Sequence, residues 1–163
     1  MEIKEFRIMI AGSRTYNNYE ELETTINGVM TTLNTVSYIK GFKLELIIVS
    51  GKAKGADTLG ERYAKENGFR VEEYPAKWND LDTQPCKIKY NSYGAYNCLA
   101  GLNRNKDMVK VSNLVFMFHD GKSTGTKDDL KLVKQYNKHY VYVNYNDYDK
   151  NEGNLEINID VYG

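Results

Sequence analysis

Residues 44–49 form a mostly apolar run that includes one charged residue, Glu45, and the segment that follows, residues 50–57, reads Ser-Gly-Lys-Ala-Lys-Gly-Ala-Asp. A run compatible with a helix, residues 58–67, comes directly after it. A strand that feeds a glycine-bearing turn at the start of a helix can bind an anion, because the free N–H groups of the first helical turn point toward the ligand. The spacing differs from the phosphate-binding loop and from the dinucleotide fingerprint, so it predicts an anion site of another kind.

The same arrangement of apolar run, small-residue turn and helix-compatible run recurs along the chain. This alternation predicts a Rossmann-like, doubly wound parallel sheet of about five strands with helices on both faces, in one domain over residues 1–163. Ligands in such folds bind beyond the carboxyl ends of the strands. The expected strands are residues 6–11, 44–49, 69–74, 113–118 and 140–145, and the expected helices are residues 19–34, 58–67, 102–111 and 127–137.

Two segments do not follow this alternation. Residues 76–101 are irregular, and within them we expect residues 79–97 to form an insertion, either a long surface loop or a loop with a short hairpin or helix. Such long loops in compact domains are often functional. In the tail, residues 146–163, apolar residues alternate with polar ones from Leu155 to Val161, so we expect an edge strand there, beyond a turn at residues 151–154.

Composition narrows the classes of function. Lys and Arg total 22, as do Asp and Glu, so the net charge is zero, which argues against a nucleic-acid partner. Cys86 and Cys98 lack metal-type spacing, so neither a metal nor another cofactor is expected, and they fit a reducing compartment. The start of the chain lacks the apolar core of a signal peptide and no run of about 18 apolar residues occurs, so we expect a cytoplasmic protein without a membrane partner.

Two residues that follow strand ends are candidate ligand contacts. Arg14 comes after the turn Gly12-Ser13 and offers a fork of donors to a phosphate or carboxylate. The alternative is a solvated arginine that pairs with Glu20 or Glu21. Asp57 is either a cap of the following helix or an acceptor for a ribose hydroxyl.

Two further segments carry candidate chemistry. Arg104 and Asn105 open a helix after the irregular segment and either hold phosphate or ribose or lie exposed on the surface. In the turn of residues 121–126, Thr126 is expected to cap the next helix, and its neighbouring amides to cradle a phosphate. Asp128 or Asp129 then serves either as a general acid or base at an N-glycosidic bond, or only as a complement to the helix dipole.

Aromatic residues of the irregular segment are also candidates. Trp78 is the better candidate for stacking on a base. For Tyr90, Tyr93 and Tyr96 we favour loop packing or a subunit contact, since aromatic residues are enriched at interfaces. His119 lies next to the glycine-bearing turn at residues 121–126 and so stays close to any ligand there.

The expected ligand-binding residues come from the turns, the two arginines and the tryptophan described above. They are Gly12, Ser13, Arg14, Ser50, Gly51, Lys52, Gly55, Ala56, Asp57, Trp78, Arg104, Asn105, Gly121, Lys122, Ser123, Gly125 and Thr126. If the protein is an enzyme, the expected catalytic residues are Arg104 and Asp128.

Five segments together resemble the SLOG superfamily, and most closely its YspA-like branch. Their order and spacing match over roughly residues 5–143. The segments are residues 10–14, 50–57, 75–78, 100–105 with Met108, and 121–128. The resemblance implies a Rossmann-like fold that binds nucleotides or nucleotide-derived ligands, and a homo-oligomer. It places Arg14, Asp57, Trp78, Arg104 and the turn at residues 121–126 in the site.

The resemblance also extends to Lonely-Guy-type phosphoribohydrolases, which use an arginine and a glutamate after a Gly-Thr pair. Here Asp128 is matched to that glutamate and is one methylene shorter. Residues 120–123, Asp-Gly-Lys-Ser, replace the proline and paired glycines of that motif, which favours binding over hydrolysis.

Three functions follow as hypotheses. The first is a sensor or sequestering protein for a nucleotide-derived signal, ADP-ribose-like or cyclic, in keeping with YspA-like proteins on phages and mobile elements. The second is a phosphoribohydrolase in which Arg104 orients the phosphate and Asp128 acts on the leaving group or water. The third is single-stranded DNA binding, against which the zero net charge counts.

Overall fold

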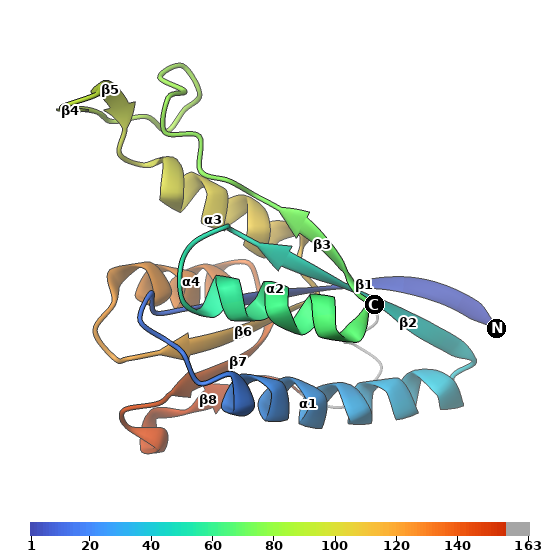
Figure 1. Ribbon diagram of the computed structural model, residues 1–163. Helices are drawn as coiled ribbons and strands as arrows, with labels where there is room; N and C mark the ends of the chain where they lie inside the picture. The colour runs from blue at the N-terminus through green and yellow to red at the C-terminus, as the bar shows by residue number, and fades with distance from the viewer. Residues whose placement is uncertain (156–163) are drawn as a thin grey trace.

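The sheet confirms the predicted α/β architecture. The computed structural model describes residues 1–155 (Figure 1). Six strands pair in the order β3-β2-β1-β6-β7-β8; the first five are parallel, and β8 is antiparallel to β7. The strands are β1 Glu2–Gly12, β2 Phe42–Ser50, β3 Arg70–Glu73, β6 Leu114–His119, β7 His139–Asn144 and β8 Glu152–Gly153.

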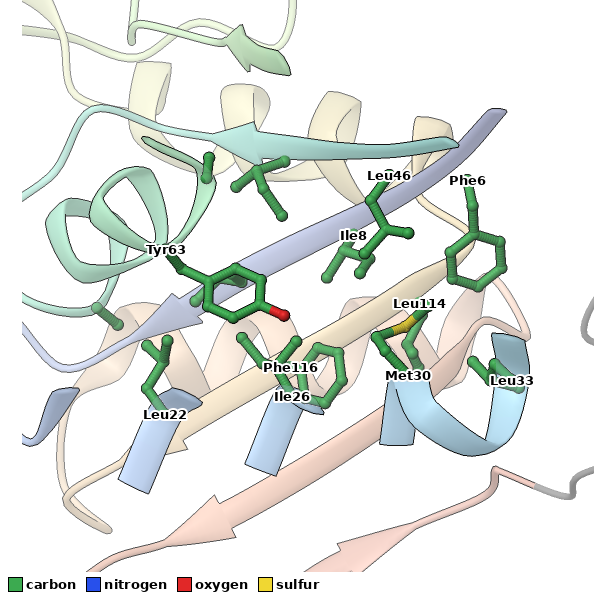
Figure 2. Close-up of a cluster of buried hydrophobic side chains, with 14 of the residues drawn as sticks. Phe6, Ile8, Leu22, Ile26, Met30, Leu33, Leu46, Tyr63, Leu114 and Phe116 are labelled. Carbon is green, nitrogen blue, oxygen red and sulfur yellow. The ribbon is translucent and has the colours of Figure 1, made fainter. Parts of the chain in front are cut away.

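Helices cover both faces of the sheet, as the alternation predicted. Successive side chains of a strand point to opposite faces. Ile8 and Ile10 of β1 therefore pack with α1 (Tyr19–Ile39) and α2 (Ala56–Asn67), while Met9 and Ala11 pack with α3 (Ala100–Val111) and α4 (Thr124–Gln135). Figure 2 shows the first of these cores, with Ile8 and Phe116 of the sheet facing side chains of α1. Residues 8–11 of β1 are buried on both faces, and this part of its sequence is a continuous apolar run rather than an alternating one.

Helix boundaries differ from the prediction where side chains shape the turns. The side chain of Asn18 accepts a hydrogen bond from the N–H of Glu21 and starts α1, which then runs on to Ile39. Helix α4 starts three residues earlier than expected, with Ser123 as its N-cap, so the expected capping role of Thr126 is wrong. The reason is the carboxylate of Asp120, which accepts the N–H groups of Lys122 and Ser123 and tightens the turn before the helix.

The irregular segment forms a small hairpin. Strands β4 (Ile88–Asn91) and β5 (Gly94–Asn97) make a separate two-stranded antiparallel sheet. Figure 1 shows this hairpin standing away from the main sheet, beyond the start of α3. At the other end of the chain, β8 lies within the expected turn at residues 151–154, and the expected strand positions Ile157, Ile159 and Val161 lie outside the described residues. None of the helices in residues 1–155 is long and apolar enough to cross a membrane.

Asn97 ties the hairpin to the body of the protein. Its side chain is 2% exposed, and its Oδ1 accepts the N–H groups of Lys87 at 3.1 Å and Leu99 at 3.0 Å. Replacement by alanine leaves two N–H groups without their acceptor, so Asn97→Ala should lower the free energy of unfolding by about 1–3 kcal/mol. Urea denaturation measures this change, and hydrogen exchange should show faster opening of residues 79–97. Asn91→Ala, at the exposed end of the hairpin, is the control and should change the stability by under about 1 kcal/mol; an equal effect of both variants would contradict the assignment.

Candidate functional site

The point where the sheet order reverses lies between β1 and β6. The chain leaves β1 toward β2 on one side, and leaves β6 toward β7 on the other. Such a switch point leaves a crevice beyond the carboxyl ends of the two strands. A cleft of about 390 Å³ lies there. It is lined by residues of the turns that follow β1 and β6 and by residues of α2, α3 and α4. Nine of the expected residues line it: Gly12, Ser13, Arg14, Asp57, Arg104, Asn105, Ser123, Gly125 and Thr126.

A second cleft adjoins the first. It has a volume of about 420 Å³ and shares Arg14 and Arg104 with the first cleft. Three more of the expected residues, Gly51, Lys52 and Trp78, line this second cleft. The structure therefore brings together most of the residues that the sequence singled out, from five separate segments of the chain.

Other expected residues lie behind the clefts and shape the turns. At Gly55 φ is +78°, and an added Cβ would lie 2.2 Å from the carbonyl oxygen of Ser13, so only glycine fits between the two turns. Gly12 is equally confined. A Cβ added to it would lie 2.2 Å from the carbonyl oxygen of Phe118 and 2.9 Å from the Cβ of the buried Ala56. These small residues allow the end of β1 to pack closely against α2 and β6.

The remaining expected residues have similar roles. Ser50 is buried, and its hydroxyl accepts the N–H of Lys52. Gly121 adopts φ +89° beside Asn144, and Lys122 has an exposed side chain.

The charge of Lys52 is not free for a ligand. Its Nζ lies 2.7 Å from Glu61 and 3.3 Å from Glu73, and these two carboxylates raise its pKa. The sequence alone gave no sign of this pairing, because the three residues come from different elements.

Two helix N-termini lie at the first cleft. Neither α2, with N-cap Gly55, nor α4, with N-cap Ser123, has a side-chain cap at its first turn. A Cβ added to Gly125 would meet nothing within 4 Å, so the first turn of α4 is open to an approaching group. N–H groups and the helix dipole at this position favour an anion.

Arg104 lies between the two clefts. Its Nη1 donates a hydrogen bond to the carbonyl oxygen of Gly51, and its Nε donates to Oδ1 of Asn105 at 2.8 Å. Next to it, Oδ2 of Asp57 accepts the N–H of Ala53 at 3.1 Å. Burial raises the pKa of Asp57 to about 6, against the opposing effects of the Ala53 N–H and of the Arg104 charge. Asp57 is therefore not the N-cap of α2, a place that Gly55 takes.

Asp129 is the carboxylate of α4 that lines the first cleft. Its side chain is 5% exposed, and Oδ1 has no hydrogen-bond partner among residues 1–155. Burial raises its pKa well above the ordinary value, and the nearby charge of Asp57 raises it further, while Arg104 lowers it.

Asp128, the expected catalytic aspartate, does not line either cleft. Asp129 lies three residues after Thr126 on the same buried face of α4, whereas Asp128 faces away from that position. The spacing from Thr126 was the sequence signal that could have selected Asp129.

Arg14 presents its side chain at the mouth of both clefts. It is exposed, and within the described part of the chain its guanidinium makes no ion pair with Glu20 or Glu21. Glu21 instead accepts the hydroxyl groups of Tyr16 at 2.8 Å and Tyr148 at 2.6 Å. The alternative of a solvated pair with these glutamates is therefore wrong.

Asp120 is a structural residue of the site that the sequence reasoning did not select. Burial alone would raise its pKa, but hydrogen bonds from the N–H groups of Ser123 and Lys122 and from the Ser123 hydroxyl hold it below the usual range. The N–H of Asp120 in turn donates to the hydroxyl of Ser13 at 3.0 Å, which joins the two turns of the switch point. His119 is buried behind them, with one ring nitrogen 2.9 Å from the carbonyl oxygen of Ser123.

Comparisons with known proteins agree with this fold. Residues 6–80 match the family described as the YspA, cpYpsA-related SLOG family. This match to a SLOG family domain agrees with the resemblance that the motifs indicated. The match covers the turns at residues 12–14 and 50–57 and ends just after Trp78. No curated protein matches the sequence.

Two solved structures of DNA processing protein A (DprA) share the fold. The protein from Streptococcus pneumoniae has a TM-score of 0.58 at 19% identity, over 85% of this chain and 50% of that one. The protein from Helicobacter pylori, described for its single-stranded DNA binding mode, has a TM-score of 0.54 at 19% identity, over 85% of this chain and 65% of that one. This chain thus spans between half and two thirds of these relatives. At such identity the likeness concerns the fold alone.

Proposed function

We propose that the protein binds a nucleotide-derived small molecule, ADP-ribose-like or a cyclic nucleotide, and acts by sensing or sequestering it. SLOG domains form a nucleotide-ligand-binding superfamily, which supports the general class. The observation that carries the proposal is the cleft at the β1–β6 switch point. There Arg14, Arg104 and the open first turn of α4 line one cavity of about 390 Å³, within the usual size of small-molecule sites.

Two parts of a nucleotide, the phosphate and the ribose, have suitable partners in this cleft. We expect a phosphate to bind at Gly125, because the first turn of α4 and both arginines line the same cleft. Asp57 lines the same cleft, and we propose that its carboxylate also accepts a ribose hydroxyl. Capture of a defence signal by a phage-encoded homo-oligomer is the biological setting that we propose for such binding.

One observation favours hydrolysis as a second candidate. Asp129 is a buried carboxyl group with a raised pKa and an unpartnered oxygen, next to an arginine. These are the properties of a general acid. In a phosphoribohydrolase, water would attack the anomeric carbon of a nucleoside monophosphate, and Asp129 would give its proton to the departing base. The products would be the free base and ribose 5-phosphate.

One experiment separates binding from hydrolysis. The purified protein is examined by native mass spectrometry, which reports a co-purified ligand and the oligomeric state, and is then incubated with AMP, ADP-ribose and cyclic AMP. Recovery of the intact probe after heat denaturation supports capture. Release of free base that is lost in Asp129→Asn but kept in Asp128→Asn supports hydrolysis. If none of the probes binds, the proposal fails.

Arg14 should contribute to affinity without being essential. Arg14→Ala removes one exposed cationic donor at the mouth of the clefts, so binding of the tightest of the three probes should weaken about tenfold, or about 1.4 kcal/mol. Isothermal titration calorimetry measures the change. Arg70→Ala is the matched control, because Arg70 is exposed at β3 and pairs with Glu5 away from the clefts. Unchanged affinity in Arg14→Ala would remove Arg14 from the site.

A further inference from the structure

We infer that the ligand is a dinucleotide, whose second nucleobase binds in a groove beside the hairpin. This inference rests on the proposed function and adds a second subsite to it. The groove, called here the aromatic groove, has a volume of about 470 Å³. It is lined by Trp78, Asn79, Asn91, Tyr93, Ala95 and Tyr96.

The aromatic groove is continuous with the clefts at the sheet edge. Trp78 lines both the second cleft and the aromatic groove, and Arg104 lines both the second and the first cleft. The two side chains lie close together, because a Cβ added to Gly101 would be 3.3 Å from the indole Cη2 of Trp78 and 3.8 Å from Nη2 of Arg104. A ligand that enters the first cleft can therefore extend past Arg104 and reach the indole ring.

The chemistry of the aromatic groove suits a nucleobase. Trp78 is 43% exposed and Tyr93 is 97% exposed, although large aromatic side chains usually bury most of their area. The rings of Trp78 and Tyr96 are 6.4 Å apart at 67°, so they do not stack on each other and leave ring faces for a third aromatic ring. Single-stranded bases are recognised by stacking on such rings and by hydrogen bonds to their edges, which Asn79 and Asn91 can supply.

The second cleft provides charge for the phosphate that would link the two nucleosides. Arg14 and Lys54 both line it, and neither makes an ion pair within residues 1–155. Lys52 is held by Glu61 and Glu73, so Arg14 and Lys54, together with Arg104, supply the positive charge of the cleft.

The hairpin holds the aromatic groove at a fixed place relative to the clefts. The N–H of Asn97 donates to the carbonyl oxygen of Trp78 at 2.8 Å, and the N–H of Cys98 donates to that of Lys87 at 2.9 Å. Trp78 is thereby bonded to the base of β5 directly. A rigidly placed second subsite favours a ligand of defined length over a flexible chain.

Calorimetry with matched probes tests the inference. The four ribonucleoside 5′-monophosphates are titrated first, and then the 5′-phosphorylated dinucleotide of the base that binds best. The dinucleotide should bind about tenfold or more tightly than its mononucleotide, as expected for one added base stack. The ratio of the dinucleotide affinity to the mononucleotide affinity should fall to about one in the double variant Tyr93→Ala with Tyr96→Ala. It should fall equally in the single variant Trp78→Ala. Tyr90→Ala is the control, because Tyr90 is 79% exposed on the same hairpin but does not line the groove, and it should keep the ratio.

The outcomes distinguish the inference from the proposed function. If neither mononucleotides nor the dinucleotide bind, the proposed function fails. If mononucleotides bind and the dinucleotide gains nothing, or if the gain survives in the tyrosine double variant, only the second subsite is overturned. A single-stranded decamer of the same base that binds far more tightly than the dinucleotide, with a steep salt dependence, would show a groove for nucleic acid and would also overturn it.

Discussion

Arg104→Ala should weaken binding of the tightest nucleotide probe by about 100-fold or more. Two of its nitrogen donors already bond Gly51 and Asn105, so the guanidinium is held in place and loses little freedom when a phosphate binds. It is also the positive charge that offsets Asp57 and Asp129 in the cleft. Its removal leaves two carboxyl groups facing the anion without compensation. Isothermal titration calorimetry measures the loss.

Two further variants make this test specific. Arg104→Lys keeps the charge but loses the fork of donors, so it should bind about tenfold more weakly than the wild type. Arg62→Ala is the matched control, because Arg62 lies on the exposed side of α2, where it pairs with Glu66 and lies over the ring of Tyr19, and it lines neither cleft. The circular dichroism spectrum should stay unchanged in all three variants. Binding by a folded Arg104→Ala protein within about threefold of the wild type would exclude Arg104 as a phosphate contact.

The central sheet was predictable because its strands are buried on both faces. The residues 44–49 lie wholly within β2, and the run at 6–11 lies within β1. Continuous apolar runs of this kind indicate parallel strands, and parallel strands bring the residues after their carboxyl ends together. That rule alone was enough to place Arg14 and Ser123 at one cleft, although 109 positions in the chain separate them.

The parts that sequence reasoning missed depend on side chains distant in the sequence or on the exact start of a helix. The start of α4 is set by the carboxylate of Asp120, so that Ser123 rather than Thr126 is the N-cap. Lys52 forms ion pairs with Glu61 and Glu73, which lie near it only in the folded chain. Neither effect has a local signal in the sequence, since each depends on tertiary contacts.

The carboxyl group of Asp57 should destabilise the folded protein at neutral pH. Its pKa is about 6 in the folded state, mainly because of burial, against an ordinary value of 3.8. The folded state therefore holds a proton that the unfolded state releases, and the free energy of unfolding falls as the pH rises from about 4 through about 6. Above that range the loss in the free energy of unfolding stays constant, at up to about 3 kcal/mol, since each pKa unit corresponds to about 1.4 kcal/mol.

Asp57→Asn should therefore be more stable than the wild type by about 2–3 kcal/mol at pH 8, and should match it near pH 4. Asparagine keeps an oxygen that can accept the N–H of Ala53, so the turn should remain intact. Urea denaturation of both proteins at the two pH values measures the difference. Glu72→Gln is a control of opposite sign, because the hydrogen bond from Arg7 lowers the pKa of Glu72, so that variant should lose stability at pH 8 and recover relative to the wild type at low pH.

A variant Asp57→Asn that is less stable than the wild type at pH 8 would contradict the raised pKa. The expected gain has a further consequence for the site. Asp129 has the same kind of penalty, deeper in the same cleft and with an unpartnered oxygen, and no structural role among the described residues offsets it. Two carboxyl groups that weaken the fold while facing one arginine are typical of a binding or catalytic site, where stability is reduced for function. The double variant Asp57→Asn with Asp129→Asn should thus be more stable at pH 8 than the wild type and than either single variant. Its binding of the nucleotide probe should depend on pH differently from that of the wild type.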